Sequence, residues 1–366
     1  MSQTPDFSRA KEILREGLDA GAYPCIAFAI GQGDRVLDSG YMGQRQVNPT
    51  PLPLERDTLF DLASLSKLVS TTMVALRMLE RGEIALTDPL SRYFDIPADA
   101  PAGRGDVTIR HLMHHNSGLT PHIPLWTQTD DANKAVEVIL RSKPWCAPGE
   151  QVHYSCMGYI LLQKILEQVG GAPLDVLAKR EVFEPLGMHD TCYNPTTKNV
   201  VTTEFSALHG EYLCGRVHDE NASFLGGVSG NAGVFSTLDD MTRFARMIAA
   251  GGSLEGNTFL NPRTFQKAIY NATPGKNEDR GLGFQLTPTF SYMTGALFSE
   301  GSYGHTGFTG TALYVDRESR LWGMILTNAV HFGRDKTELF RTRRRFFNSF
   351  ADAYFRVNTQ ENSTKE

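Results

Sequence analysis

The spacing of hydrophobic positions changes along the chain from helical to strand-like and back to helical. Residues 7–20 carry apolar side chains at the spacing of a surface helix. Two short strand-like runs follow at 25–31 and 35–43, and the Gln-Gly-Asp between them predicts a hairpin. Helical spacing then extends over 64–81, where a glycine ends it. The N-terminal part therefore predicts a helix, a β-hairpin and a long helix.

The middle of the chain predicts further helices. Loops rich in glycine and proline separate five segments of helical spacing, at 108–115, 131–141, 155–169, 173–183 and 238–250. Residues 215–233 form the longest stretch without periodicity, and so long a loop in a compact domain is usually functional or mobile. Strand signals return at 310–316 and 320–328, and a final amphipathic helix is expected over 334–357.

This order predicts an α/β fold in which both ends of the chain contribute to one antiparallel sheet flanked by helices. Residues 1–85 together with 280–358 are expected to form the sheet domain, and 86–279 an inserted, mostly helical domain. We expect the active site at the interface between these two domains. The polar residues 359–366 are expected to form a disordered tail.

Composition and charge narrow the classes of function. The 366 residues are 41% hydrophobic and carry a net charge of −5, which gives no support for nucleic-acid binding. The basic run 341–345 is interpreted as a solvated helix face or a source of salt-bridge donors. No signal peptide and no membrane-spanning segment are predicted. Five sparse cysteines favour a reducing compartment, so we expect a cytoplasmic protein unless an export signal was removed.

One short motif carries a candidate chemistry. Ser64 and Lys67 stand three residues apart at the start of a predicted helix, so they share one helix face. A serine hydroxyl becomes a nucleophile when a base removes its proton, and a lysine serves as that base when its pKa is lowered. Unpaired N–H groups at a helix start also favour negative charge. Alone the motif is weak, because a capping serine with a solvated lysine has the same spacing.

Two further segments supply groups that would complete such a site. Tyr154 lies at a loop-to-helix junction, from which its phenol can relay a proton to a leaving group. The stretch 303–310, Tyr-Gly-His-Thr-Gly-Phe-Thr-Gly, predicts a glycine-rich strand edge that a substrate carbonyl can approach. The N–H of Phe308 would then form an oxyanion hole with the N–H of Ser64.

Together these motifs resemble those of the penicillin-recognising serine hydrolases, and within them the class C β-lactamase-like group. That group carries S-x-x-K, Y-x-N and K-T-G or H-x-G in this order. The likeness extends over nearly the whole chain, including FDLASLSK at 60–67, LTDPLSRYF at 86–94, TIRHLMHHNSGLT at 108–120 and APGEQVHYSCMGYILL at 147–162. The resemblance implies the β-lactamase and transpeptidase fold and a two-step acyl transfer that requires no cofactor.

The resemblance also implies roles for individual residues. Ser64 is the expected nucleophile, Lys67 its base and Tyr154 the proton relay. The third motif is expected to contact the substrate through His305, Thr306 and Gly307. The implied partner is a small-molecule ester, amide or peptide. The oligomeric state stays open.

Two departures from the family pattern bear on the substrate. Cys156 stands where the family usually has asparagine, and a thiol offers few hydrogen bonds. His305 stands where relatives that act on penicillins keep a lysine for a substrate carboxylate. A contact through neutral imidazole predicts that activity falls as the pH drops through about 6–7. These departures favour an esterase, or an amidase or peptidase acting on D-amino-acid or muramyl-peptide substrates.

Three alternatives to this function stay open. The nearest is a weak β-lactamase or D-Ala-D-Ala carboxypeptidase. The most distant is a catalytically idle module that binds or senses a ligand. A Cys156 nucleophile paired with His153 or His305 is conceivable, although a lone cysteine is more often a packing residue.

Two histidine-containing segments have both a structural and a functional interpretation. His218, with Asp219 and Glu220, could line the substrate pocket or could only hold its own loop through hydrogen bonds. His111 and His115 share a helix face, but no nearby Cys, Asp or Glu completes a set of metal ligands. We therefore expect a substrate contact from His218 and no metal.

Overall fold

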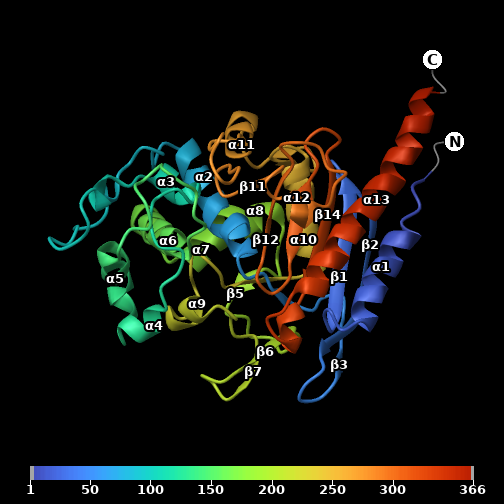
Figure 1. Ribbon diagram of the computed structural model, residues 1–366, viewed down its shortest axis with the longest axis horizontal. Coiled ribbons are helices and arrows are strands. Elements are labelled where there is room, and N and C mark those ends of the chain that lie inside the picture. Colours follow the sequence, from blue (N-terminus) through green and yellow to red (C-terminus); the bar gives the residue numbers. More distant parts are fainter. Residues whose placement is uncertain (1–3, 364–366) are drawn as a thin grey trace.

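The computed structural model describes residues 4–363 and contains a seven-stranded antiparallel sheet (Figure 1). The strand order is β11-β12-β13-β14-β1-β2-β3. These strands are β1 Cys25–Gln32, β2 Arg35–Gln46, β3 Leu52–Pro53, β11 Gln285–Leu286, β12 Tyr303–Thr306, β13 Ala312–Val315 and β14 Leu321–Thr327. β1 pairs with β2 on one side and with β14 on the other. Both ends of the chain therefore build one sheet, which confirms the predicted fold class.

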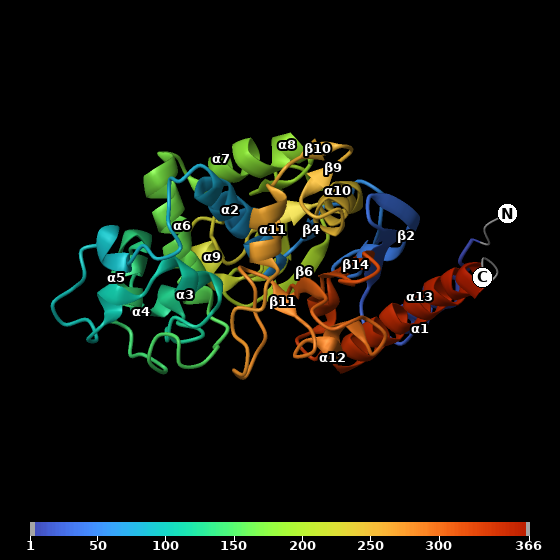
Figure 2. The same ribbon diagram turned by 90° about the horizontal axis from the view of Figure 1, so that it is seen from above.

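The central strand β1 shows why this sequence forms a sheet with two covered faces. Ile26, Phe28 and Ile30 point to one face and pack with α1 (Ser8–Asp19) and α13 (Thr337–Ser363). The alanines between them point into the larger core on the opposite face. A strand buried on both faces needs a nearly continuous run of apolar residues, and in β1 only the last residue, Gln32, is polar. Both views show α1 and α13 side by side against the sheet (Figures 1 and 2).

Apart from α12 (Ser291–Thr294), which packs against α13, the remaining helices cover the other face of the sheet or extend away from it. α10 (Leu238–Ala249) packs against β1, β13 and β14. The others are α2 Met73–Glu80, α3 Ile109–Met113, α4 Leu125–Gln128, α5 Ala135–Arg141, α6 Cys156–Gly170, α7 Leu174–Ala178, α8 Glu184–Leu186, α9 Glu220–Phe224, α11 Pro262–Ala268 and α12 Ser291–Thr294. No helix within the described residues is long and apolar enough to cross a membrane.

Several short strands were not predicted. β4 Phe60–Asp61, β8 Val234–Ser236 and β5 Cys192–Tyr193 form a three-stranded sheet, with β8 in its centre. Two hairpins pair β6 Thr202–Ser206 with β7 Glu211–Cys214, and β9 Ser253–Leu254 with β10 Asn257–Thr258. Such short strands hold too few residues to show a period of two in the sequence. The pairing of β4 with β8 matters for function, because it fixes the chain directly before Ser64.

Two predicted irregular segments are partly helical. The loop at 215–233 contains α9, whose first turn is capped by the side chain of Asp219. The expected tail at 359–366 is helical through Ser363, because α13 continues beyond its predicted end. Once a helix is formed, each further residue adds one hydrogen bond at little cost. Residues 364–366 lie outside the described part of the chain.

The division into two domains stays a prediction, and two helices cut across its boundaries. α10 belongs by sequence to the 86–279 segment, yet its apolar face packs on the sheet. α2 belongs to the 1–85 segment, yet it packs against α7 and the π-helical turn η5 (Lys179–Phe183). Packing of apolar faces, and not order along the chain, decides which region each helix joins.

Candidate active site

Ser64 lies in the turn that joins β4 to the helix leading into α2. Asp61, at the end of β4, accepts a hydrogen bond from the Ala63 N–H at 2.8 Å. Ala63 has a left-handed φ of 47°, a conformation that a residue other than glycine keeps only where its surroundings fix it. Among the described residues, the Ser64 N–H has no hydrogen-bond partner. The turn thus presents both the hydroxyl and the N–H of Ser64.

Lys67 is fully buried one turn after Ser64. Its Nζ lies 3.0 Å from Ser64 Oγ, 2.8 Å from the Asn231 carbonyl oxygen and 3.5 Å from Cys156 Sγ. It begins the π-helical turn η1 (Lys67–Thr72), and such local widenings of a helix are frequent at functional sites. The lysine is therefore directed at the serine hydroxyl, as the motif predicted.

The pKa of Lys67 lies above its usual value, so the predicted lowering is wrong. Burial lowers this pKa, but the acidic groups of Cys156 and Tyr154 raise it by more. Burial also raises the pKa of Tyr154 and of Cys156, against the opposing effect of the Lys67 charge. The resting site therefore holds an ammonium beside a neutral phenol and a neutral thiol. One of these groups must first lose a proton, and it can then accept the proton of Ser64.

Tyr154 faces the lysine from the segment that precedes α6. The Lys67 Nζ lies 4.8 Å from the centroid of its ring, and the buried phenol oxygen has no hydrogen-bond partner among the described residues. His115 packs on the tyrosine ring with 4.5 Å between centroids, and its Nδ1 accepts the Ser155 N–H at 3.1 Å. The ring is thus held by packing, which leaves the hydroxyl free for a substrate or for Ser64.

The third motif is held directly against the Ser64 turn. Thr311 Oγ1 donates to the Leu62 carbonyl oxygen at 3.0 Å. A Cβ on Gly307 would stand 2.3 Å from the same carbonyl oxygen and 2.1 Å from Thr311 Oγ1, so only glycine fits there. The Phe308 N–H, like that of Ser64, is unpartnered within residues 4–363. The unpartnered N–H groups of Ser64 and Phe308 therefore lie on two segments that contact each other at the pocket.

His305 is a neutral hydrogen-bond acceptor near the C-terminal end of β12. Its Nδ1 lies 2.7 Å from the Thr306 carbonyl oxygen, which can only accept, so Nδ1 carries the proton and Nε2 has a free lone pair. Nε2 is buried without a partner among the described residues. Burial, and then the charges of Arg280 and Lys67, keep the His305 pKa well below its usual value. The predicted loss of activity at pH 6–7 therefore needs correction, because the imidazole stays neutral to lower pH.

A pocket of about 510 Å³ brings together six predicted site residues, Ser64, Tyr154, His305, Thr306, Gly307 and Phe308. The other three, Lys67, Cys156 and His218, do not line it and lie behind its wall. The sequence did not predict any of the other residues that line the pocket, which include Arg280, Phe290, Tyr292, Arg334, Lys336 and Arg343. The interpretation of 341–345 as a solvated face is wrong for Arg343, which is 1% exposed.

His218 supports Phe308 from behind the pocket wall. The two rings stack with 5.7 Å between centroids, and His218 Nε2 lies 3.0 Å from Glu204 Oε1. Arg334 forms ion pairs with Glu204 and Glu220. Burial raises the pKa of Glu204, but the bonds to His218 and Arg334 outweigh it and lower this pKa to about 2. A direct contact of His218 with substrate stays a prediction.

The other histidines and Cys156 have structural partners. His153 bonds to Gln151 and packs on Trp145, which directs it away from Cys156. His111 Nδ1 accepts the Thr108 N–H at 3.1 Å and so caps α3. In the part of the chain that the structure describes, no cluster of three or more His, Cys, Asp or Glu side chains could hold a metal ion. Cys156 does not line the pocket, and its Sγ is 3.5 Å from Lys67 Nζ, so the geometry gives no support to a Cys156–His153 pair.

Comparisons with known proteins agree with this arrangement. Residues 10–346 match the Beta-lactamase family. A putative D-alanyl-D-alanine carboxypeptidase of Escherichia coli is 30% identical over 87% of this chain and 81% of its own length. An N-acetylmuramyl-L-alanine amidase of Bacillus subtilis is 26% identical over 90% of this chain and 83% of its own length. The structure of EstCE1, a hydrolase with promiscuous acyltransferase activity, has a TM-score of 0.74 at 22% identity and covers 93% of this chain and 97% of that one.

The family match spans nearly all of the elements that build the sheet and the pocket. The fold that the resemblance implied is confirmed by the sheet and by the solved structures, and the enzyme class is confirmed by the relatives. The chain belongs to the Beta-lactamase family of serine hydrolases.

Proposed function

We propose that Ser64 forms an acyl-enzyme with an ester or amide substrate. The observation that carries the proposal is the 3.0 Å contact between Lys67 Nζ and Ser64 Oγ, beside the free N–H groups of Ser64 and Phe308. Ser64 Oγ attacks the substrate carbonyl carbon as its proton passes to the Lys67–Tyr154 pair, which has first lost one proton. The carbonyl oxygen becomes an oxyanion that accepts bonds from the two N–H groups.

The second half of the reaction restores the serine. The bond to the alcohol or amine breaks, and the Tyr154 phenol donates a proton to this leaving group. Water then attacks the ester carbon on Ser64 and transfers its proton to the same Lys67–Tyr154 pair. The Ser64 oxygen leaves with a proton returned by that pair, and the acid is released. Ser64, Lys67 and Tyr154 carry out every proton transfer with the substrate and with water, so the proposal requires no cofactor.

The relatives and the pocket together favour a small ester, amide or peptide substrate. Two curated relatives are named as an amidase and a putative carboxypeptidase, and EstCE1 is named as a hydrolase with acyltransferase activity. A D-amino-acid or muramyl-peptide amide therefore stands beside a simple ester. His305 Nε2 supplies an acceptor for a substrate N–H or O–H. The free cysteines fit a cytoplasmic location.

A labelling experiment tests the acyl-enzyme directly. The protein is incubated with a fluorophosphonate, and the labelled peptide is identified by mass spectrometry. We expect the label on Ser64, no label on Ser64→Ala, and normal labelling of Ser91→Ala, whose serine is exposed and lies outside the pocket. A label on another residue, or full esterase activity of Ser64→Ala, would contradict the proposal.

A substrate panel separates the finer alternatives. It compares p-nitrophenyl butyrate, nitrocefin, D-Ala p-nitroanilide and a muramyl-L-Ala peptide by kcat/KM. We expect the ester, or one of the amides, to exceed nitrocefin, because the third motif offers a neutral imidazole in place of a lysine. Nitrocefin as the best substrate would favour the β-lactamase alternative. Failure to react with any activated ester would favour an idle binding module.

A further inference from the structure

His115 occupies a backbone position that usually belongs to a smaller residue. It follows the end of α3, where the His115 N–H donates to the Leu112 carbonyl oxygen at 3.3 Å. The next N–H, that of Asn116, donates to the His111 carbonyl oxygen at 3.1 Å. These two bonds form a Schellman motif, whose left-handed residue is usually glycine or asparagine. His115 has a left-handed φ of 56° and is 2% exposed, so a bulky buried residue stands there under backbone strain.

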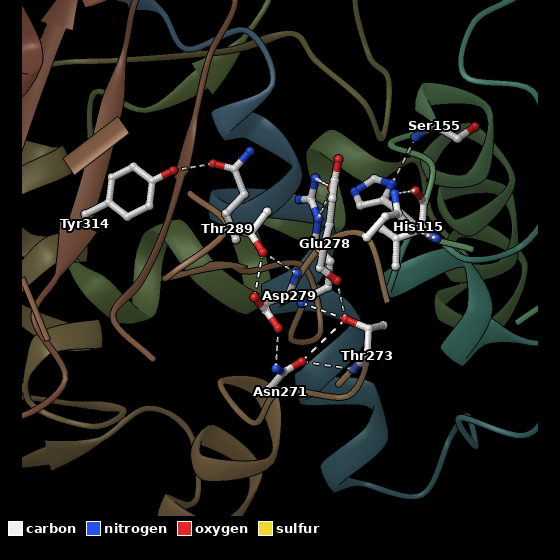
Figure 3. Close-up of polar contacts among 12 residues, drawn as sticks. His115, Ser155, Asn271, Thr273, Glu278, Asp279, Thr289 and Tyr314 are labelled. Atoms are coloured by element: carbon white, nitrogen blue, oxygen red, sulfur yellow. Dashed lines mark hydrogen bonds and ion pairs between the residues drawn. The ribbon is translucent and has the colours of Figure 1, made fainter. Parts of the chain in front are cut away.

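The imidazole of His115 carries two further energetic costs. Its Nδ1 accepts the Ser155 N–H at 3.1 Å, so Nδ1 has the lone pair and Nε2 carries the proton of a neutral ring (Figure 3). The Nε2–H is buried without a hydrogen-bond partner among the described residues. Burial, and then the charges of Arg280 and Lys67, hold the pKa of His115 well below its ordinary value. An apolar residue would fill this space without these costs, which points to a role beyond packing.

The main-chain N–H groups on both sides of Tyr154 bond to His115. The His153 N–H donates to the His115 carbonyl oxygen at 2.7 Å, and the Ser155 N–H donates to the imidazole. The Ser155 side chain is fixed as well, because its Oγ donates to the Thr120 carbonyl oxygen at 2.8 Å. The backbone that carries the Tyr154 phenol is therefore held by one histidine from both sides.

The ring of His115 also packs against two tyrosine rings. Its centroid lies 4.5 Å from that of Tyr154 and 5.1 Å from that of Tyr159. The Tyr159 hydroxyl lies 3.1 Å from Thr72 Oγ1, within hydrogen-bond distance, at the end of η1. η1 begins at Lys67, whose Nζ lies 4.8 Å from the Tyr154 centroid and 5.8 Å from the Tyr159 centroid. The three rings therefore connect the proposed proton relay to the helical turn that carries the proposed base.

We propose that His115 is the positioning residue of the proton relay and sets where the Tyr154 hydroxyl stands relative to Lys67 and the leaving group. This inference rests on the proposed Ser64 hydrolase and adds a residue to it. A proton donor must lie within hydrogen-bond reach of the atom that it protonates. The Tyr154 hydroxyl has no hydrogen-bond partner among the described residues, so its place depends on what holds its ring and backbone. His115 contacts both.

The variant His115→Asn tests the proposal in the full chain. Asparagine suits the left-handed backbone and can offer an oxygen to the Ser155 N–H, so this variant loses mainly the ring. Phenyl acetate and 2,4-dinitrophenyl acetate are compared by kcat/KM, which covers the steps up to release of the leaving group. Phenoxide needs a proton to leave, whereas dinitrophenoxide does not. We expect the value for phenyl acetate to fall by about tenfold or more, and the value for the dinitrophenyl ester by a smaller factor.

A double-substitution cycle separates a positioning role from a purely structural one. Tyr154→Phe keeps the ring but removes the hydroxyl, and it should lower kcat/KM for phenyl acetate by about 10²-fold or more. If His115 acts by placing that hydroxyl, adding His115→Asn to Tyr154→Phe should change the rate by no more than about twofold. A histidine that serves only stability would lower the rate by the same factor in both backgrounds, and that result would overturn the proposal.

The matched control is His331→Asn. His331 is 5% exposed, its Nε2 accepts the Asn48 N–H at 3.1 Å, and its ring centroid lies 5.3 Å from that of Tyr212. It thus resembles His115 in burial and contacts, but it does not line the pocket and has no contact with Tyr154. His331→Asn should lose stability and keep the parental ratio of the two substrates. The same change of ratio in this control would count against a specific role of His115.

A second variant decides the matter if His115→Asn does not fold. Thr72→Val keeps the shape of the side chain but removes the hydrogen bond to the Tyr159 hydroxyl. We expect the substrate ratio to shift in the same direction by a smaller factor, and not to shift in the Tyr154→Phe background. A parental ratio in this variant would then overturn the proposal.

The cycle also distinguishes failure of this inference from failure of the hydrolase. If Tyr154→Phe kept the parental rates with both esters, the proton relay of the proposed function would fail, and the positioning role with it. If Tyr154→Phe lost activity while folded His115→Asn kept the parental ratio, the hydrolase would stand and only the role of His115 would be overturned.

Discussion

The two walls of the pocket are built in different ways. On the wall that carries Ser64, the one ammonium is surrounded by three acceptors of the protein, the Ser64 hydroxyl, the Asn231 carbonyl and the Cys156 thiol. On the wall formed by α13 and the segment before β11, Arg343 has no acidic partner among the residues that the structure describes. The charge on the first wall is therefore surrounded by acceptors of the protein, and the charge of Arg343 on the second wall is not. We therefore expect the first wall to set the rate for every substrate and the second to choose among substrates.

The largest expected effect is loss of the base on the first wall. Lys67→Met keeps the length of the side chain but removes the amine that contacts Ser64 Oγ. We expect kcat to fall by about 10³-fold or more on charged and neutral esters alike, as when one member of a catalytic group is removed. Initial rates with p-nitrophenyl butyrate and hydrogen glutarate measure this. Lys134→Met, at an exposed helix position, is the control. A loss confined to one substrate would break the proposed division of roles.

The next effect tests the junction between Ser64 and the third motif. Gly307→Ala would place a Cβ 2.3 Å from the Leu62 carbonyl oxygen, which cannot move without the Ser64 turn. We expect a loss of about 1–3 kcal/mol in the free energy of unfolding, as for other overpacked sites, together with reduced activity. Chemical denaturation measures the first and esterase rates the second.

The matched control is Gly158→Ala in α6, where a Cβ would meet nothing nearer than 3.6 Å. A glycine inside a helix costs up to about 1 kcal/mol relative to alanine, so this variant should be as stable as the parent or more so. If Gly307→Ala were equally harmless, the close approach of the two segments would not be required.

These two walls also differ in how far the sequence predicts them. Ser64, Lys67 and Tyr154 stand in short motifs at helix starts, where spacing along the chain determines spacing in the fold. Arg343 stands in a basic run that has the composition of a solvated face. Only the packing of α13 on the sheet decides that this one arginine points inward. Local spacing therefore predicts the catalytic wall, and tertiary packing determines the other.

The fold also has one part that local spacing predicts and another part that it does not. The long amphipathic helices and the central hairpins were predicted, because their periods persist over many residues. The pairing of β4 with β8 was not, since each strand has only two or three residues. The direction of the Lys67 pKa shift was missed for a related reason, because it depends on Cys156 and Tyr154, both distant in sequence.

The stability of arginine variants on α13 provides a third test of the difference between the two walls. A buried charge without a partner destabilises the folded state, so Arg343→Met should raise the free energy of unfolding by about 1–3 kcal/mol. Arg341→Met should change it by less than about 0.5 kcal/mol, as an exposed site does. Urea unfolding of both variants measures the difference. A strongly destabilised Arg343→Met would mean that the guanidinium has a structural partner.

Two of the buried histidines, His115 behind Tyr154 and His305 on β12, predict a loss of stability in acid. Burial and nearby positive charges hold the pKa of His115 and of His305 well below the ordinary value near 6.5. Below pH 6.5 the unfolded chain binds protons that the folded chain excludes, so each histidine lowers stability by up to about 1.4 kcal/mol per pH unit. Urea midpoints between pH 7.5 and 5.5 should therefore decrease, and less steeply in His305→Gln. An unchanged slope in that variant would contradict the assignment.

The smallest effect concerns the thiol that replaces the family asparagine. Burial lowers the pKa of Lys67, and Cys156 is the largest influence that raises it. Removing the thiol in Cys156→Ala should therefore lower the pKa of Lys67, so the rise of kcat/KM with pH should begin at lower pH. At pH 7 the change in rate should stay within about fivefold, the worth of one neutral hydrogen bond. Cys192→Ala, outside the pocket, should keep the parent profile. If Cys156→Ala abolished activity, the thiol would belong to the chemistry itself, and the first wall would need a different base and nucleophile from those proposed.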